Sequence, residues 1–254
     1  MKSLHYGWVI CAGCVLLLFG MGLISNTFTV SLAGIVQYND ITKTQASLIV
    51  AIRGIFAFLA TVFIDRYYAK IGIRHGVALA ALSLAAAFFI FALAPSYGVY
   101  CLAAAIAGIA YGLGMMVPVS ILIFRWFNQR RALALGLSSG GTGIATIVGA
   151  PAVQFLIDSC GLRAAFIAQA IFMVTVFGLL LMILRNYPSE KGLEPFGGTM
   201  DYGGSQVKVR KYNRTLNQNE LILVAAVMIL VGAGSPPATA HLSIHFINAG
   251  YTAM

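Results

Sequence analysis

Seven stretches of this chain are almost entirely apolar, and each is long enough to cross a membrane as a helix. A helix needs about 20 such residues to cross a hydrocarbon core about 30 Å thick. The stretches do not alternate between apolar and polar positions, as strands of a membrane β-barrel do. Because lipid cannot satisfy the polar groups of an irregular backbone, the pattern predicts an all-α, polytopic membrane protein. The stretches are Trp8–Val30, Gln45–Ile64, Gly76–Ala94, Val99–Phe124, Ala132–Ile157, Ala164–Leu184 and Leu221–Ile247.

Composition and charge agree with a membrane protein and predict its orientation. Hydrophobic residues make up 60% of the chain and charged residues 9%, whereas soluble domains have about 25% charged residues. With a cytoplasmic N-terminus, 13 Lys and Arg residues lie inside and only Lys43 and Arg163 lie outside. The positive-inside rule therefore predicts this orientation. The net charge of +9 is thereby explained by orientation in the lipid bilayer and not by nucleic-acid binding. We expect the protein to lie in a bacterial plasma membrane.

One polar segment is much longer than the others and divides the chain. Residues 185–219 are basic, contain two Gly-Gly pairs and show no apolar periodicity, which is typical of a flexible linker. We expect residues 1–184 to form a six-helix bundle and residues 185–219 a cytoplasmic loop. Residues 220–254 then form a seventh membrane helix, the start of an incomplete second bundle. We expect residues 1–254 alone not to transport.

Paired glycines recur in the first, fourth and seventh stretches, at Gly20-Met21-Gly22, Gly112-Leu113-Gly114 and Gly232-Ala233-Gly234. Their spacing suits a chain built from three-helix repeats, as in many secondary transporters. Chance and close packing between membrane helices explain the glycines equally well.

Arg53 is the only formally charged residue well inside one of the stretches. It precedes Asp65 by 12 residues, which places it about 18 Å from the cytoplasmic end of a helix. A charge at this depth needs a partner or water. Arg53 therefore either pairs with a substrate carboxylate or satisfies backbone carbonyls. Tyr111, near mid-membrane, and Asn26, near the outer end of the first stretch, are further candidate substrate ligands, although packing and interhelical hydrogen bonds also explain them.

Three motifs lie outside the apolar stretches. The loop after the fourth stretch carries Trp126-Phe127 and Arg130-Arg131 and is followed by Gly136 and Gly140. Gly7-Trp8-Val9 opens the first stretch, and a segment from Pro188 to Gly197, Pro-Ser-Glu-Lys-Gly-Leu-Glu-Pro-Phe-Gly, follows the sixth. Together they resemble the major facilitator superfamily, and within it the monocarboxylate transporters and the bacterial oxalate/formate-type proteins. Gln129 departs from that pattern, where a basic residue is often found.

The resemblance implies a secondary transporter that moves a small organic anion by alternating access, together with protons or in exchange for a counter-anion. It implies no cofactor. It also implies a cytoplasmic gating role for Trp126, Phe127, Arg130, Arg131, Gly136 and Gly140.

The loop after the second stretch resembles the superfamily's general Asp-Arg signature in altered form. Asp65-Arg66 is present, Gly72 and Arg74 follow after a longer spacer, and Thr61 replaces the first glycine. An Asp at a helix end can hold an Arg and the positive end of a neighbouring helix, so the resemblance implies a latch. Anchoring by positive charges at the inner leaflet is the alternative.

Enzyme signatures are absent from the sequence: it has no Walker loop, no His-Glu-x-x-His and no nucleophile elbow, and the four cysteines lack metal-ligand spacing. We therefore expect neither an enzyme nor a metal site. The alternatives that stay open are a drug or sugar porter of the same superfamily, a seven-helix receptor of opposite orientation, and a truncated product that does not transport.

Overall fold

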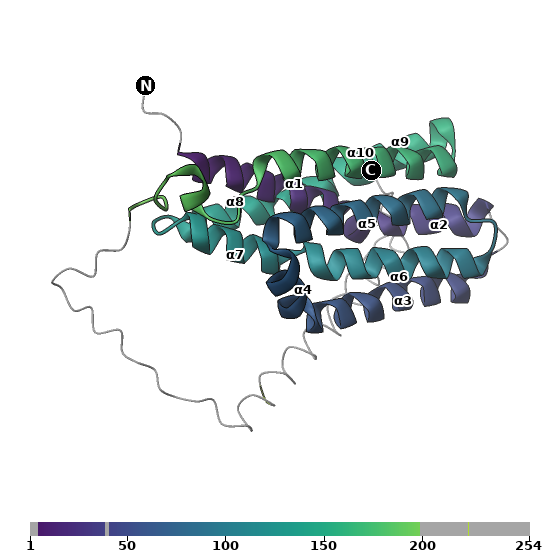
Figure 1. Ribbon diagram of the computed structural model, residues 1–254. Coiled ribbons are helices and arrows are strands. Elements are labelled where there is room, and N and C mark those ends of the chain that lie inside the picture. Colours follow the sequence, from purple (N-terminus) through teal and green to yellow (C-terminus); the bar gives the residue numbers. More distant parts are fainter. Residues whose placement is uncertain (1–4, 39–40, 199–222, 224–254) are drawn as a thin grey trace. The chain divides into compact units, whose positions relative to one another are not determined.

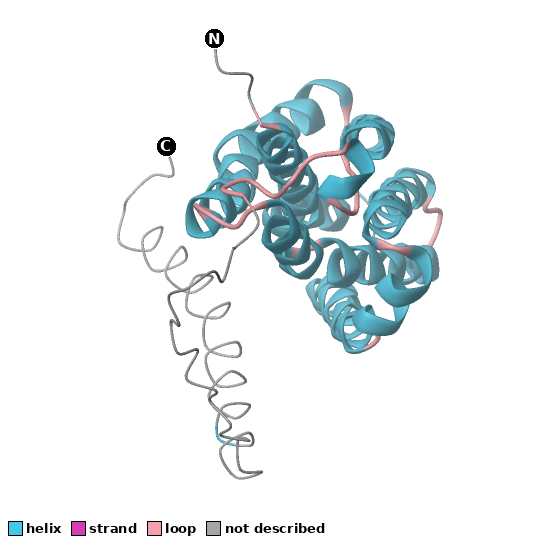
Figure 2. Cartoon of the chain, turned by 60° about the vertical axis from the view of Figure 1, so that its left-hand side comes forward, coloured by secondary structure: helices cyan, strands magenta, loops and turns pink. Residues whose placement is uncertain are grey.

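The computed structural model describes residues 5–38, 41–198 and 223, and the described part consists of helices and loops (Figure 2). Six of its helical segments are long and apolar enough to span a membrane. They coincide with the first six predicted stretches and confirm an all-α, polytopic membrane protein. The segments are Tyr6–Val36, Thr44–Val62, Ile73–Leu93, Tyr97–Trp126, Arg131–Cys160 and Leu162–Ile183. The predicted seventh helix and most of the predicted linker lie outside the described residues.

The first membrane segment consists of two helices, α1 (Tyr6–Asn26) and α2 (Phe28–Tyr38), with a break at Thr27. The Thr27 hydroxyl donates a hydrogen bond to the carbonyl of Leu23, four residues earlier. Threonines that bond back to their own helix in this way bend it. The sequence predicts Asn26 near the outer end of this segment. The helical segment instead continues to Tyr38, so Asn26 lies well inside it.

Two prolines interrupt the fourth and fifth segments. Proline lacks an N–H, and its ring clashes with the carbonyl four residues earlier. Pro118 accordingly follows a break at Met115 between α6 (Tyr97–Gly114) and α7 (Met116–Trp126). Pro151 follows a π-helical turn, residues Ala145–Gly149, which joins α8 (Arg131–Ile144) to α9 (Ala150–Cys160).

The remaining spanning helices are α3 (Lys43–Val62), α5 (Ile73–Leu93) and α10 (Leu162–Ile183). The short helix α4 (Ile64–Ile71) joins α3 to α5 through a turn at Gly72, whose φ of 76° favours glycine. Tyr68 of α4 is buried and donates to the carbonyl of Leu113 at 2.6 Å. Burial raises the pKa of the Tyr68 hydroxyl, so the group stays a donor at physiological pH.

The long helices lie side by side (Figure 1): α5 packs against α10 and α6, α3 against α6, and α1 against α8. Glycines permit the closest approaches. A Cβ atom on Gly22 would lie 2.7 Å from the Cβ of Ala145, and one on Gly112 would lie 3.0 Å from that of Ala60. The glycine pairs of the first and fourth stretches therefore serve helix packing, and the third pair lies outside the described residues.

Candidate functional site

The three candidate substrate ligands, Arg53, Tyr111 and Asn26, meet at the last turn of α1. The Arg53 guanidinium donates a hydrogen bond to the carbonyl of Ile24. The Tyr111 hydroxyl donates to Ser25 Oγ at 3.4 Å. Arg53 of α3 and Tyr111 of α6 thus bind the consecutive residues Ile24 and Ser25. Asn26 follows directly.

The break at Thr27 explains why Arg53 is held at this position. The last carbonyls of a helix have no partner within it, and Ile24 supplies one of these carbonyls at the end of α1. Arg53 also lies beside the first residue of α2, with its guanidinium carbon 5.0 Å from the ring centroid of Phe28. The side chain therefore bridges the break between α1 and α2. Its bond to a backbone carbonyl is one of the two roles that the sequence analysis considered for Arg53.

Bonding to Ile24 leaves Arg53 with capacity for a ligand. A guanidinium carries five N–H donors, and within the described residues its one hydrogen bond is to Ile24. The side chain is half-buried, and Tyr111 is close enough to interact with it electrostatically. A carboxylate could therefore approach the remaining donors in the same orientation of the side chain.

Asn26 joins α1 to the π-helical turn of the fifth segment. Its Nδ2 donates to the Thr142 carbonyl at 3.1 Å and to Thr146 Oγ1 at 2.7 Å. Asn26 thus makes interhelical hydrogen bonds, which the sequence analysis considered as the alternative to substrate binding. π-Helical turns occur frequently at functional sites, and this one lies beside the end of α1.

Sequence reasoning missed Ser25, Thr142 and Thr146, which bring these candidates together. A signal was available for Ser25 only: Ser25, Asn26 and Thr27 form a run of three polar residues in an otherwise apolar stretch.

The three motifs that carry the family resemblance meet at the opposite end of α1. We call Trp8, Trp126, Phe127 and Phe196 the Trp126 cluster. Three of its rings contact one another: the Trp8 centroid lies 5.2 Å from that of Phe127 and 5.8 Å from that of Phe196. The Trp126 ring lies 5.4 Å from that of Tyr6. Trp126 and Phe127 are fully buried.

Backbone hydrogen bonds fix the segment after α10 to this cluster. Phe196 N–H donates to the Trp126 carbonyl at 2.8 Å, and Asn128 N–H donates to the Phe196 carbonyl at 2.9 Å. The Trp126 indole donates to the Arg185 carbonyl at 3.0 Å. Residues 185–198, which the sequence predicts as part of a flexible linker, are therefore packed onto the bundle.

Arg130 and Arg131 have different structural positions in the loop between α7 and α8. Arg130 is exposed and has a left-handed backbone, with φ of 60°, directly before α8. Arg131 folds back and donates to the carbonyl of Phe127 and to Asn128 Oδ1. Gly136 and Gly140 lie one turn apart on the exposed side of α8, with open space beside them.

The residues of the Asp-Arg signature separate into two places. Arg74, at the start of α5, donates to the carbonyl of Leu181, and its backbone N–H donates to Asn186 Oδ1 at 2.9 Å. It thereby ties α5 to the end of α10. Asp65 and Arg66 are exposed on α4, and we find no ion pair of Asp65 with another described residue. The latch stays a prediction.

Known proteins show similarity to this chain over most of its length. The family described as Major Facilitator Superfamily matches residues 12–254. Monocarboxylate transporter 12 of Homo sapiens is 26% identical over 178 residues, which cover 67% of this chain and 33% of that protein. The Xenopus laevis protein of the same name is 24% identical over 265 residues, covering 93% of this chain and 56% of its own length.

A bacterial protein is among the relatives. The oxalate:formate antiporter of Oxalobacter formigenes is 26% identical over 130 residues, which cover 51% of this chain and 30% of that protein. The chain therefore spans between about a third and just over half of the length of these relatives. Because the family match extends over nearly all of its residues, the chain belongs to the major facilitator superfamily.

Proposed function

We propose that this chain forms part of a secondary transporter that moves a small organic anion, a monocarboxylate or a dicarboxylate such as oxalate. The observation that carries the proposal is the position of Arg53, a cation within a membrane-spanning helix that is held at the break between α1 and α2. The relatives named as monocarboxylate transporters and as an oxalate:formate antiporter support the same substrate class.

Arg53 serves as the counter-charge of the substrate in this proposal. A charge-assisted, bidentate bond between guanidinium and carboxylate is stronger than a bond to a neutral carbonyl. An arriving carboxylate therefore binds the donors of Arg53 that the Ile24 carbonyl leaves unused. Tyr111 and Asn26 are further hydrogen-bond donors at the same level, after release from Ser25 and Thr146.

Transport proceeds by alternating access, in which two bundles rock around a site near the middle of the membrane. The helix breaks at Thr27 and Met115 are the points at which α1 and α6 can bend. The Trp126 cluster and the exposed Asp65 and Arg66 then lie at the cytoplasmic side, as the positive-inside rule predicts for a bacterial plasma membrane. A proton or counter-anion gradient drives the cycle.

Uptake measurements on the transporter with both bundles present test this proposal. We expect oxalate, formate or lactate to be taken up and other carboxylates to compete. Arg53→Gln should abolish uptake while expression and melting temperature stay unchanged. Lys70→Gln, which removes an exposed cation of α4, should transport like the unmodified protein.

Two results would contradict the proposal. Unchanged uptake by the Arg53→Gln variant would show that Arg53 is not the counter-charge of the substrate. Competition by sugars or cationic drugs, but not by carboxylates, would assign the protein to the drug or sugar porters of the superfamily.

A further inference from the structure

Helix α4 presents an open, basic depression where it joins two membrane-spanning helices. The depression has a volume of about 500 Å³ and is lined by Phe63, Arg66, Tyr67, Ala69 and Lys70. The helix connects the end of α3 to the start of α5, and Figure 1 shows its axis running across those of the long helices. A short helix in this position lies at the boundary between hydrocarbon and water.

The charge in this depression is positive. Arg66 and Lys70 lie four residues apart on one side of α4, and both side chains are exposed. In the described part of the chain we find no hydrogen bond or ion pair that joins either of them to another residue. The Arg66 guanidinium carbon lies 6.0 Å from the ring centroid of Phe63. Asp65 is exposed on the same helix but does not line the depression, so a ligand there meets two cations and no carboxylate.

Apolar side chains next to these cations are exposed as well. Leu59, Val62 and Phe63 follow one another at helical spacing where α3 ends, and they are 44%, 59% and 53% exposed. Tyr67 is half-buried, and its hydroxyl donates to the carbonyl of Gly76 at 2.9 Å, which fixes the ring beside the depression. A ligand that uses both surfaces therefore carries a negative charge and an apolar part.

We propose that this depression binds the headgroup of an anionic phospholipid such as phosphatidylglycerol. The phosphate pairs with the forked guanidinium of Arg66 and with the ammonium group of Lys70. An acyl chain of the lipid packs on Leu59, Val62 and Phe63. Basic residues at the ends of membrane helices attract anionic lipids in this way, whereas a soluble anion would leave the exposed apolar side chains without a partner.

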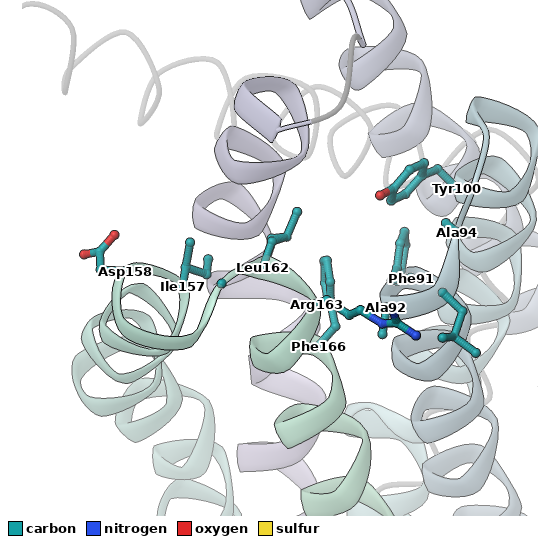
Figure 3. A pocket seen from close by; sticks show the side chains of 11 residues that line it. Phe91, Ala92, Ala94, Tyr100, Ile157, Asp158, Leu162, Arg163 and Phe166 are labelled. Atoms are coloured by element: carbon teal, nitrogen blue, oxygen red, sulfur yellow. The ribbon is translucent and has the colours of Figure 1, made fainter.

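The site is separate from the other charged regions of the bundle. Arg53, on which the proposed transport function rests, does not line it, and its occupation is not required for transport. At the opposite end, a cavity between α5 and α10 is lined by both Asp158 and Arg163 (Figure 3), so it favours neither sign of charge. Arg163 is exposed there and serves as the control arginine for lipid binding.

Native mass spectrometry of the full chain in mild detergent measures the binding of single lipid molecules. The probes are phosphatidylglycerol and phosphatidylcholine with the same acyl chains. We expect the tightest site to prefer phosphatidylglycerol about 25-fold, because each of the two cations contributes about fivefold. Glycerol 3-phosphate, which carries the phosphate without acyl chains, should not displace the lipid at the concentrations at which phosphatidylglycerol saturates the site.

Substitutions assign this binding to α4. The double variant Arg66→Gln/Lys70→Gln should lose about 25-fold in affinity for phosphatidylglycerol and keep its affinity for phosphatidylcholine. Arg66→Lys combined with Lys70→Arg keeps both charges and should retain the preference, which separates loss of charge from misfolding. Arg163→Gln should bind phosphatidylglycerol like the unmodified protein. Arg53→Gln should do so as well, even where it abolishes uptake.

Unchanged affinity for phosphatidylglycerol in the double variant would overturn the proposal, and so would an equal loss in Arg163→Gln. Displacement of the lipid by glycerol 3-phosphate would assign the depression to a soluble anion instead. Loss of the preference in Arg53→Gln would assign the lipid to the transport site.

Discussion

The guanidinium of Arg53 on α3 donates a hydrogen bond to the carbonyl oxygen of Ile24 on α1, at the turn where the first membrane segment is broken. This bond satisfies two requirements at once. It gives a partner to a charge inside the membrane and to a carbonyl that the end of α1 leaves without one. Among the described residues no carboxylate pairs with Arg53, so its positive field is available to an anion.

Arg53→Lys separates the two roles of this side chain. Lysine keeps the positive charge and a donor for the Ile24 carbonyl, but it lacks the fork of donors that pairs bidentately with a carboxylate. We expect the melting temperature to change little and the apparent affinity for the anion to fall about tenfold, which corresponds to about 1.4 kcal/mol. Thermal unfolding and concentration-dependent uptake measure the two effects. An unchanged affinity would show that the guanidinium acts only as a point charge.

Trp126→Phe tests the junction between the bundle and the segment after α10. The substitution removes the indole N–H that donates to the Arg185 carbonyl at 3.0 Å, in a side chain that is fully buried. The unsatisfied carbonyl and the lost volume should lower the free energy of unfolding by about 2–3 kcal/mol. Circular dichroism of the purified protein during heating measures this change.

Trp8→Phe is the matched control, because Trp8 belongs to the same cluster and is only half-buried. It should cost less than about 1 kcal/mol. If both variants lose the same free energy of unfolding, the hydrogen bond from Trp126 to Arg185 does not contribute to the stability.

The positions of the six spanning segments in the described part of the chain could be predicted from sequence, because each one is a run of apolar residues of membrane length. The breaks within these helices were harder to predict from the sequence. Pro118 and Pro151 lie inside such runs, and membrane helices tolerate proline where neighbours satisfy the freed groups. Here Tyr68 donates to the carbonyl of Leu113, one of those left without a partner where α6 ends at Gly114.

The candidate site could be predicted in part. The isolated charge identified Arg53, and the polar side chains of the first and fourth stretches identified Asn26 and Tyr111. Their meeting at consecutive residues of α1 depends on helix packing, which no local pattern encodes. The same holds for Trp8, which contacts Phe196 from the other end of the described chain.

Gly108→Ala tests the close approach of α6 to α3. A Cβ atom on Gly108 would collide with the backbone carbonyl of Arg53 and lie 3.1 Å from the backbone nitrogen of Ala57. Because backbone atoms cannot rotate away, α3 must shift, and we expect a loss of about 1–3 kcal/mol in stability. The shift should also displace Arg53 and reduce uptake.

Gly98→Ala provides the control on the same helix, since nothing lies within 4 Å of a Cβ atom at Gly98. Alanine has the higher helix propensity, so this variant should be as stable as the unmodified protein or slightly more stable. Gly108→Ala with normal stability and uptake would contradict the packing seen between α3 and α6.

Gln169→Leu tests a buried polar group that the fold satisfies only in part. Gln169 on α10 is 4% exposed, and its Nε2 donates to the Ala165 carbonyl at 3.3 Å. Its Oε1 has no hydrogen-bond partner within the described residues. A buried acceptor without a partner costs about 1–3 kcal/mol, whereas a typical intramolecular hydrogen bond contributes only about 0.5–1.5 kcal/mol. Leucine of similar volume should therefore raise the free energy of unfolding by about 1 kcal/mol, measured by thermal unfolding.

The control for Gln169→Leu is Gln154→Leu, in which the lost bond to Asp158 is exposed. An exposed interaction of this kind is worth less than about 1 kcal/mol, so its removal should leave the melting temperature nearly unchanged. If Gln169→Leu instead lowered the melting temperature while Gln154→Leu did not, Oε1 must accept a hydrogen bond in the folded protein. The donor would then be a water molecule or a residue outside the described part of the chain, and Gln169 would contribute to the polar interior of the bundle and not to its apolar packing.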